Sequence, residues 1–153
     1  MRARNVFMDS LVAHGVERIF GNPGTTESPF MLALERYPQL PYILALQEAS
    51  VMGMADGYAR ARGRPAFVNI HVAAGLANAM SGLYNASKGG TPLVVTAGQS
   101  DTRMLMGEPS LSGDLVRMAR QYTKWSHEVL HAADIPAAVR RAFTVVQAPP
   151  AGP

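Results

Sequence analysis

The stretch that decides the fold reads PYILALQEASVMGMADGYARARGRPAFVNIH and covers residues 41–71. An apolar run at 42–47 is followed at once by a segment of small residues at 49–61, and a second apolar run follows at 66–71. Consecutive apolar positions of this kind are typical of strands covered on both faces, as in a parallel sheet. The stretch therefore predicts a strand, a crossover helix and a second parallel strand.

The same alternation continues through the rest of the chain. Further strands are predicted at residues 18–21, 93–99 and 122–129. Helix starts are indicated by Ser28 before Pro29, by Asp114, and by Asp134 before Pro136. Strands and helices in alternation predict a three-layer α/β/α fold with a mostly parallel sheet, whose ligands lie beyond the carboxyl ends of the strands.

The N-terminal segment predicts an amphipathic helix that ends at Gly15. Its buried stripe is expected to contain Val6, Phe7, Leu11 and Val12.

The composition fits one domain and argues against membrane insertion. The 153 residues are 48% hydrophobic and 16% charged, which is enough for one domain with a substantial core. No apolar run approaches the roughly 20 residues that cross a bilayer, and the N-terminus lacks the apolar core of a signal peptide. We therefore expect a cytoplasmic protein with no membrane partner.

Metal and nucleic-acid sites have little support in the sequence. The chain has no cysteine, and its four histidines form no pair suited to a metal, so no built-in metal site is expected. The net charge of +3 comes from arginines scattered along the chain without interleaved aromatic residues. We therefore expect no nucleic-acid partner.

The first predicted strand ends in an unusual turn, FGNPGTTESPF at residues 20–30. Pro23 and Gly24 force the chain to turn tightly, and Thr25 and Thr26 present hydroxyl and N–H groups near the start of the next helix. A ligand-binding loop and a well-capped turn are both consistent with this pattern.

The second predicted strand ends at Gln47 and Glu48. A carboxylate in the first turn of a helix is favoured by the helix dipole by about 0.3–1 kcal/mol, so Glu48 could be an ordinary surface charge. Its neighbours are apolar, however, and a buried acid at the carboxyl end of a strand is a candidate proton donor or hydrogen-bond partner for a ligand nitrogen. The residues alone leave both alternatives open.

The third strand end is NIHVAAGLANAM, in which His71 precedes a helix rich in Ala, Gly, Ser and Asn. Side chains this small let a partner helix or a flat ligand approach closely. His71 is either part of a site or a rim histidine satisfied by a backbone carbonyl. The chain has no P-loop lysine after GNPGTTES, no GxGxxG after the first strand and no GxSxG, which argues against nucleotide-binding and serine-hydrolase functions.

Four segments, taken together and in order, resemble a known family. They are residues 15–30, 42–86, 92–99 and 124–129, and the QEA and ADGYAR sequences of the second segment are the most specific. They are similar to the N-terminal, pyrimidine-binding domain of thiamine diphosphate-dependent decarboxylases. The sequence NIHVAAG, which contains His71, points to the benzoylformate decarboxylase branch of that family.

The resemblance implies roles for individual residues. Glu48 would hydrogen-bond N1′ of the cofactor's aminopyrimidine ring and promote its reactive tautomer. His71 would act in proton transfer, and Thr25 stands where this branch has a serine that contacts the substrate carboxylate. The residues expected to line the cofactor pocket are Pro23, Gly24, Gly75 and Asn78.

The resemblance also implies a reaction and partners. The substrate would be a 2-oxo acid, decarboxylated without oxidation to an aldehyde with thiamine diphosphate and Mg2+ as cofactors. An acetolactate synthase-like carboligase, a non-catalytic binding or assembly module and an unrelated flavodoxin-like domain are the alternatives. The functional unit would be a homo-oligomer, a dimer or tetramer, with the cofactor site between subunits.

Members of this family are much longer than the present chain. Residues 1–148 would form the pyrimidine domain, and 149–153 would lead into a last strand that the chain lacks and that lies beside 122–129 in the family. The middle domain and the diphosphate-binding domain, whose Gly-Asp-Gly motif binds Mg2+, have no counterpart here. We therefore expect a fragment that binds the cofactor weakly and is inactive alone, with the segment after about residue 110 displaced or covered by another copy.

Overall fold

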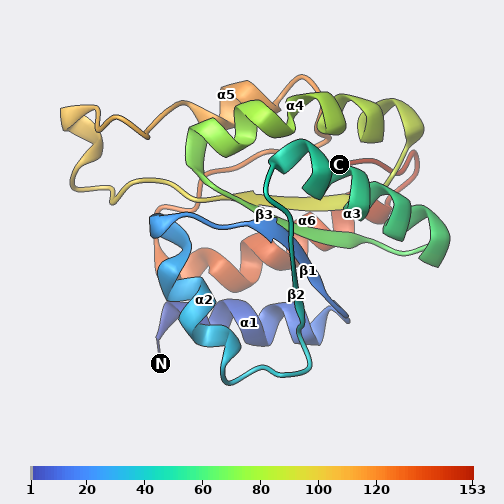
Figure 1. The fold of residues 1–153 in the computed structure, drawn as a ribbon, viewed down its shortest axis with the longest axis horizontal. Coiled ribbons are helices and arrows are strands. Elements are labelled where there is room, and N and C mark those ends of the chain that lie inside the picture. Colours follow the sequence, from blue (N-terminus) through green and yellow to red (C-terminus); the bar gives the residue numbers. More distant parts are fainter. Residues whose placement is uncertain (1) are drawn as a thin grey trace.

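The computed structural model describes residues 2–153 and places a parallel sheet between two layers of helices (Figure 1). The strands are β1 Ile19–Asn22, β2 Tyr42–Leu44, β3 Ala66–Ile70 and β4 Leu93–Ala97. The α-helices are α1 Ala3–Ala13, α2 Ser28–Leu34, α3 Glu48–Arg62, α4 Val72–Gly89, α5 Leu115–Ala119 and α6 Ile135–Gln147. Short 3-10 helices cover Thr25–Glu27, Leu105–Gly107 and Ala132–Asp134. The predicted three-layer α/β/α fold is confirmed.

The sheet has the strand order β2-β1-β3-β4, and every neighbouring pair is parallel. All five residues of β3 are buried, because β3 lies between β1 and β4 and under helices on both faces. Asn22 at the end of β1 pairs with Ile70 at the end of β3, and Ile70 pairs with Ala97 at the end of β4. The loops that follow these three strands therefore meet at one edge of the sheet.

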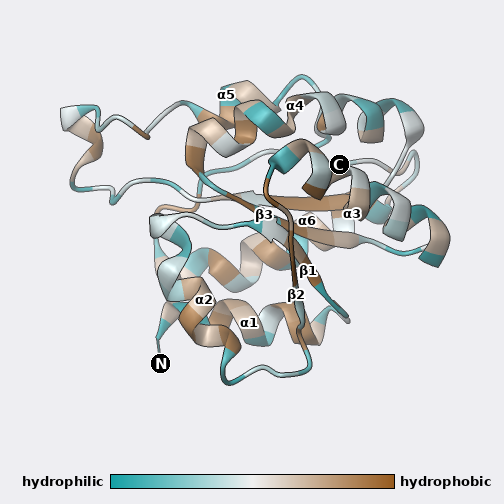
Figure 2. Ribbon diagram, in the orientation of Figure 1, coloured by the Kyte–Doolittle hydropathy of each residue, from teal (hydrophilic) through white to brown (hydrophobic). Residues whose placement is uncertain are grey.

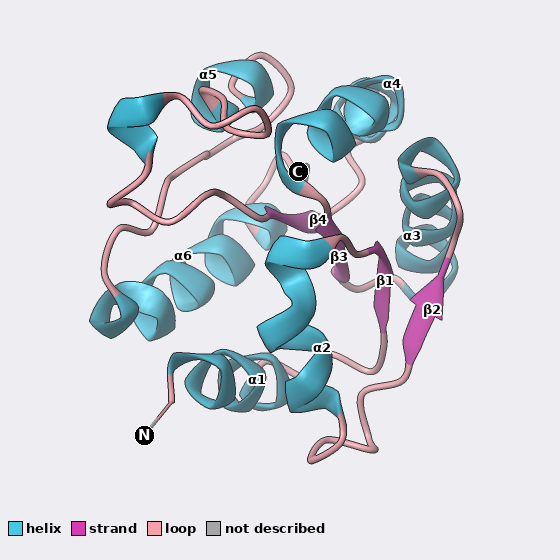
Figure 3. Cartoon of the chain, turned by 60° about the vertical axis from the view of Figure 1, so that its left-hand side comes forward, coloured by secondary structure: helices cyan, strands magenta, loops and turns pink. Residues whose placement is uncertain are grey.

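Each face of the sheet carries its own hydrophobic core, and Figure 3 shows the two helix layers on opposite sides of the strands. The core under α3 and α4 includes Val51, Met52, Ala55, Val68, Leu76 and Ala79. The core under α1, α2 and α6 includes Met8, Leu11, Ile19, Phe67, Val94 and Phe143. The central strands accordingly carry the hydrophobic colour in Figure 2. None of the helices in residues 2–153 is long and apolar enough to span a membrane.

The buried stripe of α1 differs from the prediction at Val12, and Val6 is only half-buried. Met8 and Leu11 are fully buried and Phe7 packs beside them, but Val12 is 39% exposed. Successive helical residues are rotated by about 100°, so Val12 turns away once Leu11 faces the core. The expectation that Val12 is buried is wrong.

The second strand is shorter than predicted, since β2 ends at Leu44 and the side chain of Leu46 is 91% exposed. β2 is an edge strand, and after Ala45, whose N–H donates to the carbonyl of Gly21 over 3.0 Å, the chain leaves the sheet. The side chain of Gln47 accepts hydrogen bonds from the N–H groups of Ala49 and Ser50 and so caps α3. Residues 45–47 therefore connect β2 to α3 and are not part of the strand.

The fifth predicted strand, at residues 122–129, is not formed. A cavity of about 650 Å3 separates β4 from residues 125–129, so this segment has no neighbour with which to form a β-ladder. α5 and α6 line the same cavity, as does Pro153. The prediction of a strand at residues 122–129 is therefore wrong.

Candidate functional site

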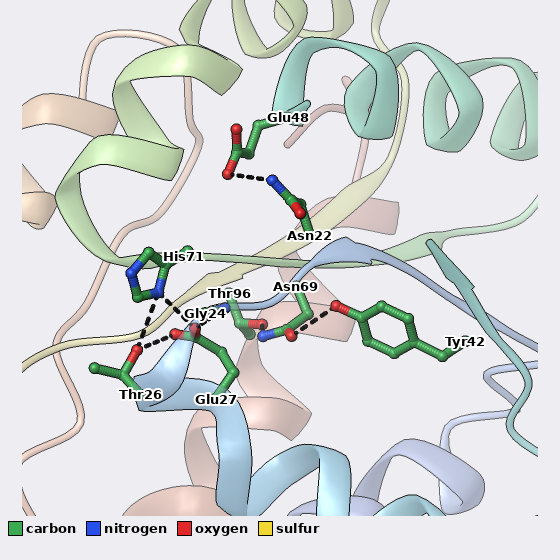
Figure 4. Close-up of polar contacts among 9 residues, drawn as sticks. All are labelled: Asn22, Gly24, Thr26, Glu27, Tyr42, Glu48, Asn69, His71 and Thr96. Carbon is green, nitrogen blue, oxygen red and sulfur yellow. Dashed lines mark hydrogen bonds and ion pairs between the residues drawn. The ribbon is translucent and has the colours of Figure 1, made fainter. Parts of the chain in front are cut away.

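Glu48 lies at the carboxyl edge of the sheet and is buried, with 4% of its surface exposed. Its Oε1 accepts a hydrogen bond from Nδ2 of Asn22 at the end of β1 over 3.1 Å (Figure 4). Its Oε2 accepts one from Nδ2 of Asn78 on α4, also over 3.1 Å. Both carboxylate oxygens are thus held by amide donors from two different elements. The structure decides between the two sequence alternatives in favour of a buried carboxylate.

The position of Glu48 depends on the turn before it and on a glycine opposite. Because Gln47 caps α3, Glu48 is the first residue of that helix and points toward α4. A Cβ atom on Gly75 of α4 would lie 2.9 Å from Oε1 of Glu48. A glycine at position 75 therefore gives the Glu48 carboxylate the room to occupy this position.

A second buried carboxylate, Glu27, lies in the turn after β1 and is 4% exposed. Its Oε2 accepts a hydrogen bond from the N–H of Gly24 over 2.8 Å and lies 2.7 Å from Nδ1 of His71. Its Oε1 accepts a hydrogen bond from the hydroxyl of Thr26 over 2.5 Å. Glu27 thus joins the loop after β1 to the residue that follows β3.

The sequence analysis missed Glu27, although a signal was present. Glu27 follows Gly24 by three residues, and this spacing is that of a capping box, in which a glutamate side chain bonds back to the N–H at the helix start. The partnership with His71 has no such local signal, because 44 positions separate the two residues in the chain.

Two glycines let these groups come together. A Cβ atom on Gly24 would lie 2.2 Å from Nδ1 of His71, and one on Gly98, just after β4, would lie 1.9 Å from Oε1 of Glu27. The backbone of each loop therefore runs directly against a side chain of the site. Gly98 was not among the predicted site residues.

The predicted residues of the first turn lie at this edge but differ in their contacts. Pro23 and Gly24 are half-buried, and Thr25 is exposed. The hydroxyl of Thr26, not that of Thr25, approaches His71, with 3.3 Å between Oγ1 and Nδ1. Thr25 makes no side-chain hydrogen bond within residues 2–153, so its hydroxyl is open to solvent.

Val72, the residue after His71, has a backbone φ of +33° and a fully buried side chain. This conformation is a genuine outlier for a β-branched residue and is held only where the surrounding packing fixes it. Such strain concentrates at functional sites. Here it lies at the junction of β3 and α4 that carries His71.

A buried chain of hydrogen bonds runs beneath the site. The hydroxyl of Tyr42 donates to Oδ1 of Asn69 over 3.1 Å, and Nδ2 of Asn69 lies 3.5 Å from Oγ1 of Thr96. Burial, and after it the nearby charge of Glu27, raise the pKa of Tyr42 far above its usual value. Tyr42 therefore stays protonated and acts as a donor (Figure 4).

The polar site and the cavity beside β4 are separate. Neither Glu48 nor His71 lines the cavity beside β4, whose walls are mostly aliphatic. Residues 2–153 contain no group of three or more His, Asp or Glu side chains placed to hold a metal ion.

A parallel sheet whose carboxyl edge carries a buried carboxylate and a carboxylate–imidazole pair defines a ligand-binding α/β domain. The family model "Thiamine pyrophosphate enzyme, N-terminal TPP binding domain" matches residues 1–135, and the chain belongs to this family. The resemblance on which the sequence analysis relied is confirmed.

Known relatives agree with this assignment. Benzoylformate decarboxylase of Pseudomonas aeruginosa is 46% identical over 142 residues, covering 92% of this chain and 26% of the relative. The acetolactate synthase isozyme 3 large subunit of Escherichia coli is 32% identical over 144 residues, covering 94% of this chain and 25% of the relative. The chain thus spans about a quarter of the length of these proteins.

Solved structures superpose over the whole chain. The crystal structure of benzoylformate decarboxylase from Polynucleobacter necessarius is 40% identical with a TM-score of 0.94 and covers 100% of this chain, which spans 29% of that one. A thiamine diphosphate-dependent 4-hydroxybenzoylformate decarboxylase from Rhodococcus jostii is 36% identical with a TM-score of 0.95 and the same two coverages.

Proposed function

We propose that this domain holds the aminopyrimidine ring of thiamine diphosphate at the carboxyl edge of its sheet, with the carboxyl group of Glu48 facing ring nitrogen N1′. The observation that carries the proposal is the burial of Glu48 between the amide donors of Asn22 and Asn78, each 3.1 Å away. An acid fixed in this way, in a dry setting, can share a proton with an aromatic nitrogen.

The surroundings of Glu48 fit a flat ring. Gly75 has no side chain to crowd the carboxylate of Glu48, and Pro23 and Gly24 form the neighbouring loop. Asn78 holds the other carboxylate oxygen. When bound, thiamine diphosphate supplies the electron sink for decarboxylation, and the part of this chain is to orient the ring and to hold a proton at Glu48.

His71 and Thr25 are proposed to act on the substrate side of the site. The side chain of His71 is 21% exposed, so it is reachable from the edge where the loops meet. It would move a proton, as the imidazole can do near neutral pH. The exposed hydroxyl of Thr25 would donate to a substrate carboxylate.

For the longer protein we propose non-oxidative decarboxylation of a 2-oxo acid of the benzoylformate type to an aldehyde. The 46% identity to the Pseudomonas enzyme supports this reaction. The Mg2+ and diphosphate ligands would lie outside this chain, which alone would decarboxylate nothing.

The alternative is an acetolactate synthase-like carboligation, supported by the 32% identity to the Escherichia coli subunit. Product analysis with a 2-oxo acid separates them, since one yields an aldehyde and the other an acetohydroxy acid.

A homo-oligomer with the cofactor site between subunits is part of the proposal. Leu46, two residues before Glu48, is 91% exposed, and Leu44 is 58% exposed. On α3, Gly53 and Gly57 face open space, so a second helix could approach this face closely. Light scattering on the longer protein tests this, and a monomer with full cofactor affinity would contradict it.

We also propose that the cavity beside β4 seats a further strand. No strand pairs with the outer edge of β4 in the part of the chain that the structure describes. Pro153 already lines this cavity, and its carbonyl accepts a hydrogen bond from the N–H of Lys124 over 2.7 Å. A strand that continues from Pro153 would lie between β4 and residues 125–129 and supply the ladder that both segments lack.

The test of the cofactor proposal is a titration of the 15N-labelled chain with thiamine diphosphate, followed by the amide signals of Gly24, Gly75 and Asn78. We expect weak binding, near a Kd of about 1 mM, because the groups proposed to bind the diphosphate lie outside this chain. Glu48→Ala should abolish the shifts, while Glu35→Ala, at an exposed position, should leave them unchanged. Unchanged shifts in Glu48→Ala would refute the role of Glu48, and micromolar affinity of the wild-type chain would refute the expected weakness.

A further inference from the structure

We infer that Glu27 is a positioning residue that fixes His71 in the tautomer with its proton on Nδ1, so that the lone pair of Nε2 faces the site. Oε2 of Glu27 lies 2.7 Å from Nδ1 of His71, and only 3% of the Glu27 side chain is exposed. This pair is separate from the Glu48 cluster, which Asn22 and Asn78 complete.

The direction of the hydrogen bond follows from the neighbours of Nδ1. Both oxygens of Glu27 already accept hydrogen bonds, Oε2 from the N–H of Gly24 and Oε1 from the hydroxyl of Thr26, so Glu27 faces Nδ1 as an acceptor and Nδ1 donates to it. The hydroxyl proton of Thr26 is already given to Oε1 of Glu27 over 2.5 Å. Toward Nδ1, 3.3 Å away, the Thr26 oxygen can therefore only accept. Both polar neighbours of Nδ1 are acceptors, and the proton is placed on this nitrogen.

The ring of His71 is packed against the loop that carries Glu27. The backbone of Gly24 runs against it so closely that a Cβ atom would lie 2.2 Å from Nδ1. His71 is the residue before the first turn of α4, and the strained, buried Val72 fixes the backbone there. Nε2 has no hydrogen-bond partner within residues 2–153, which makes it the nitrogen available to a ligand.

The consequence for chemistry rests on the proposed function. In this tautomer His71 takes up a proton at Nε2 and, as imidazolium, returns it from the same atom. The carboxylate of Glu27, 2.7 Å from Nδ1, stabilises the positive ring, as an orienting carboxylate does beside a catalytic histidine. A histidine with the opposite tautomer would present an N–H instead and could not accept the proton there.

The experiment is 15N spectroscopy of the whole chain labelled at its histidine rings, at an alkaline pH where free imidazole is neutral. His71→Gln identifies the His71 signals by their loss. We expect Nδ1 of His71 to have the shift of a protonated nitrogen and Nε2 that of an unprotonated one. Glu27→Leu should reverse or average the two shifts, whereas Thr26→Val should keep the wild-type pattern because Glu27 is intact.

A wild-type chain with the proton on Nε2, or a folded Glu27→Leu chain with the wild-type pattern, would overturn the inference. If Glu27→Leu does not fold, Glu27→Asp replaces it, since it withdraws the carboxylate by one methylene group, and the same change is expected. No cofactor is present in these measurements. Failure of cofactor binding therefore leaves this result standing, and failure of the tautomer leaves the role proposed for Glu48 untouched.

Discussion

Gly75 and Glu48 lie so close that a single methyl group on Gly75 would stand 2.9 Å from Oε1 of the carboxylate. The contact joins the start of α3 to the first turns of α4 at the edge of the sheet. The atom that a methyl group would meet is the far end of a flexible side chain. The glycine therefore matters for where the carboxylate points more than for whether the domain folds.

Gly75→Ala should accordingly displace Glu48 at little cost in stability. Alanine is favoured over glycine inside a helix by up to about 1 kcal/mol, which offsets the side-chain shift. The displaced carboxylate should lose its hydrogen bonds to Asn22 and Asn78. The side-chain NH2 signals of these two asparagines report the change, and unaltered signals in a folded Gly75→Ala chain would show that the carboxylate has not moved.

Gly82→Ala should destabilise the fold instead. A Cβ atom on Gly82 would lie 2.4 Å from Cβ of Met52, and this atom is fixed by the α3 backbone. Overpacking of this kind costs about 1–3 kcal/mol. Urea denaturation measures the loss, and Gly57→Ala is the matched control because Gly57 on α3 faces open space. Equal stability of the two variants would contradict the close α3–α4 contact.

The fold could be predicted from the sequence where local pattern and environment agree. The sequence of β3, AFVNI, is apolar except for Asn69 and predicts a strand covered on both faces, and all five of its residues are buried. Residues 122–129 are also predicted as a strand, although polar residues separate their apolar ones. A strand also needs a partner at hydrogen-bonding distance, and here a cavity lies where that partner would be. The sequence pattern indicates that a segment can form a strand, but a hydrogen-bonding partner decides whether the strand forms.

The site could be predicted only in part for the same reason. Glu48 stands out locally, since a carboxylate interrupts an apolar run at a strand end. Its burial, however, depends on Asn22 and Asn78, which come from other elements. The capping-box spacing indicates the bond of Glu27 to the N–H of Gly24, but no spacing along the chain indicates that Glu27 meets His71 or Gly98.

The contacts of Glu17 with Tyr58 and Arg62 should make the free energy of unfolding depend on pH. A hydrogen bond from Tyr58, then one from Arg62, hold the pKa of Glu17 below its usual value. A carboxyl group with a lowered pKa in the folded state contributes stability above its unfolded pKa, and this contribution is lost as the pH falls through the folded pKa. Tyr58→Phe should therefore be less stable than wild type near neutral pH.

The two stability curves should approach each other on acidification, because protonated Glu17 no longer gains from Tyr58. Urea denaturation at a series of pH values tests this. The phenylalanine ring keeps the packing of Tyr58 against Phe20, so the comparison isolates the hydroxyl. A difference that stays constant through the acidic range would mean that the hydroxyl does not act through the charge of Glu17.

A short apolar extension after Pro153 should stabilise the domain by filling the cavity beside β4. About six residues match a typical strand, and each large aliphatic side chain that becomes buried contributes about 1.5–3 kcal/mol. Ordering the backbone costs about 1–2 kcal/mol per residue, so the net gain depends on burying most of the new side chains. We expect a higher urea midpoint and slower amide exchange in β4 and in residues 125–129. A Gly/Ser extension of equal length provides the control. Equal midpoints for the two extended chains would mean that the cavity does not accept a strand.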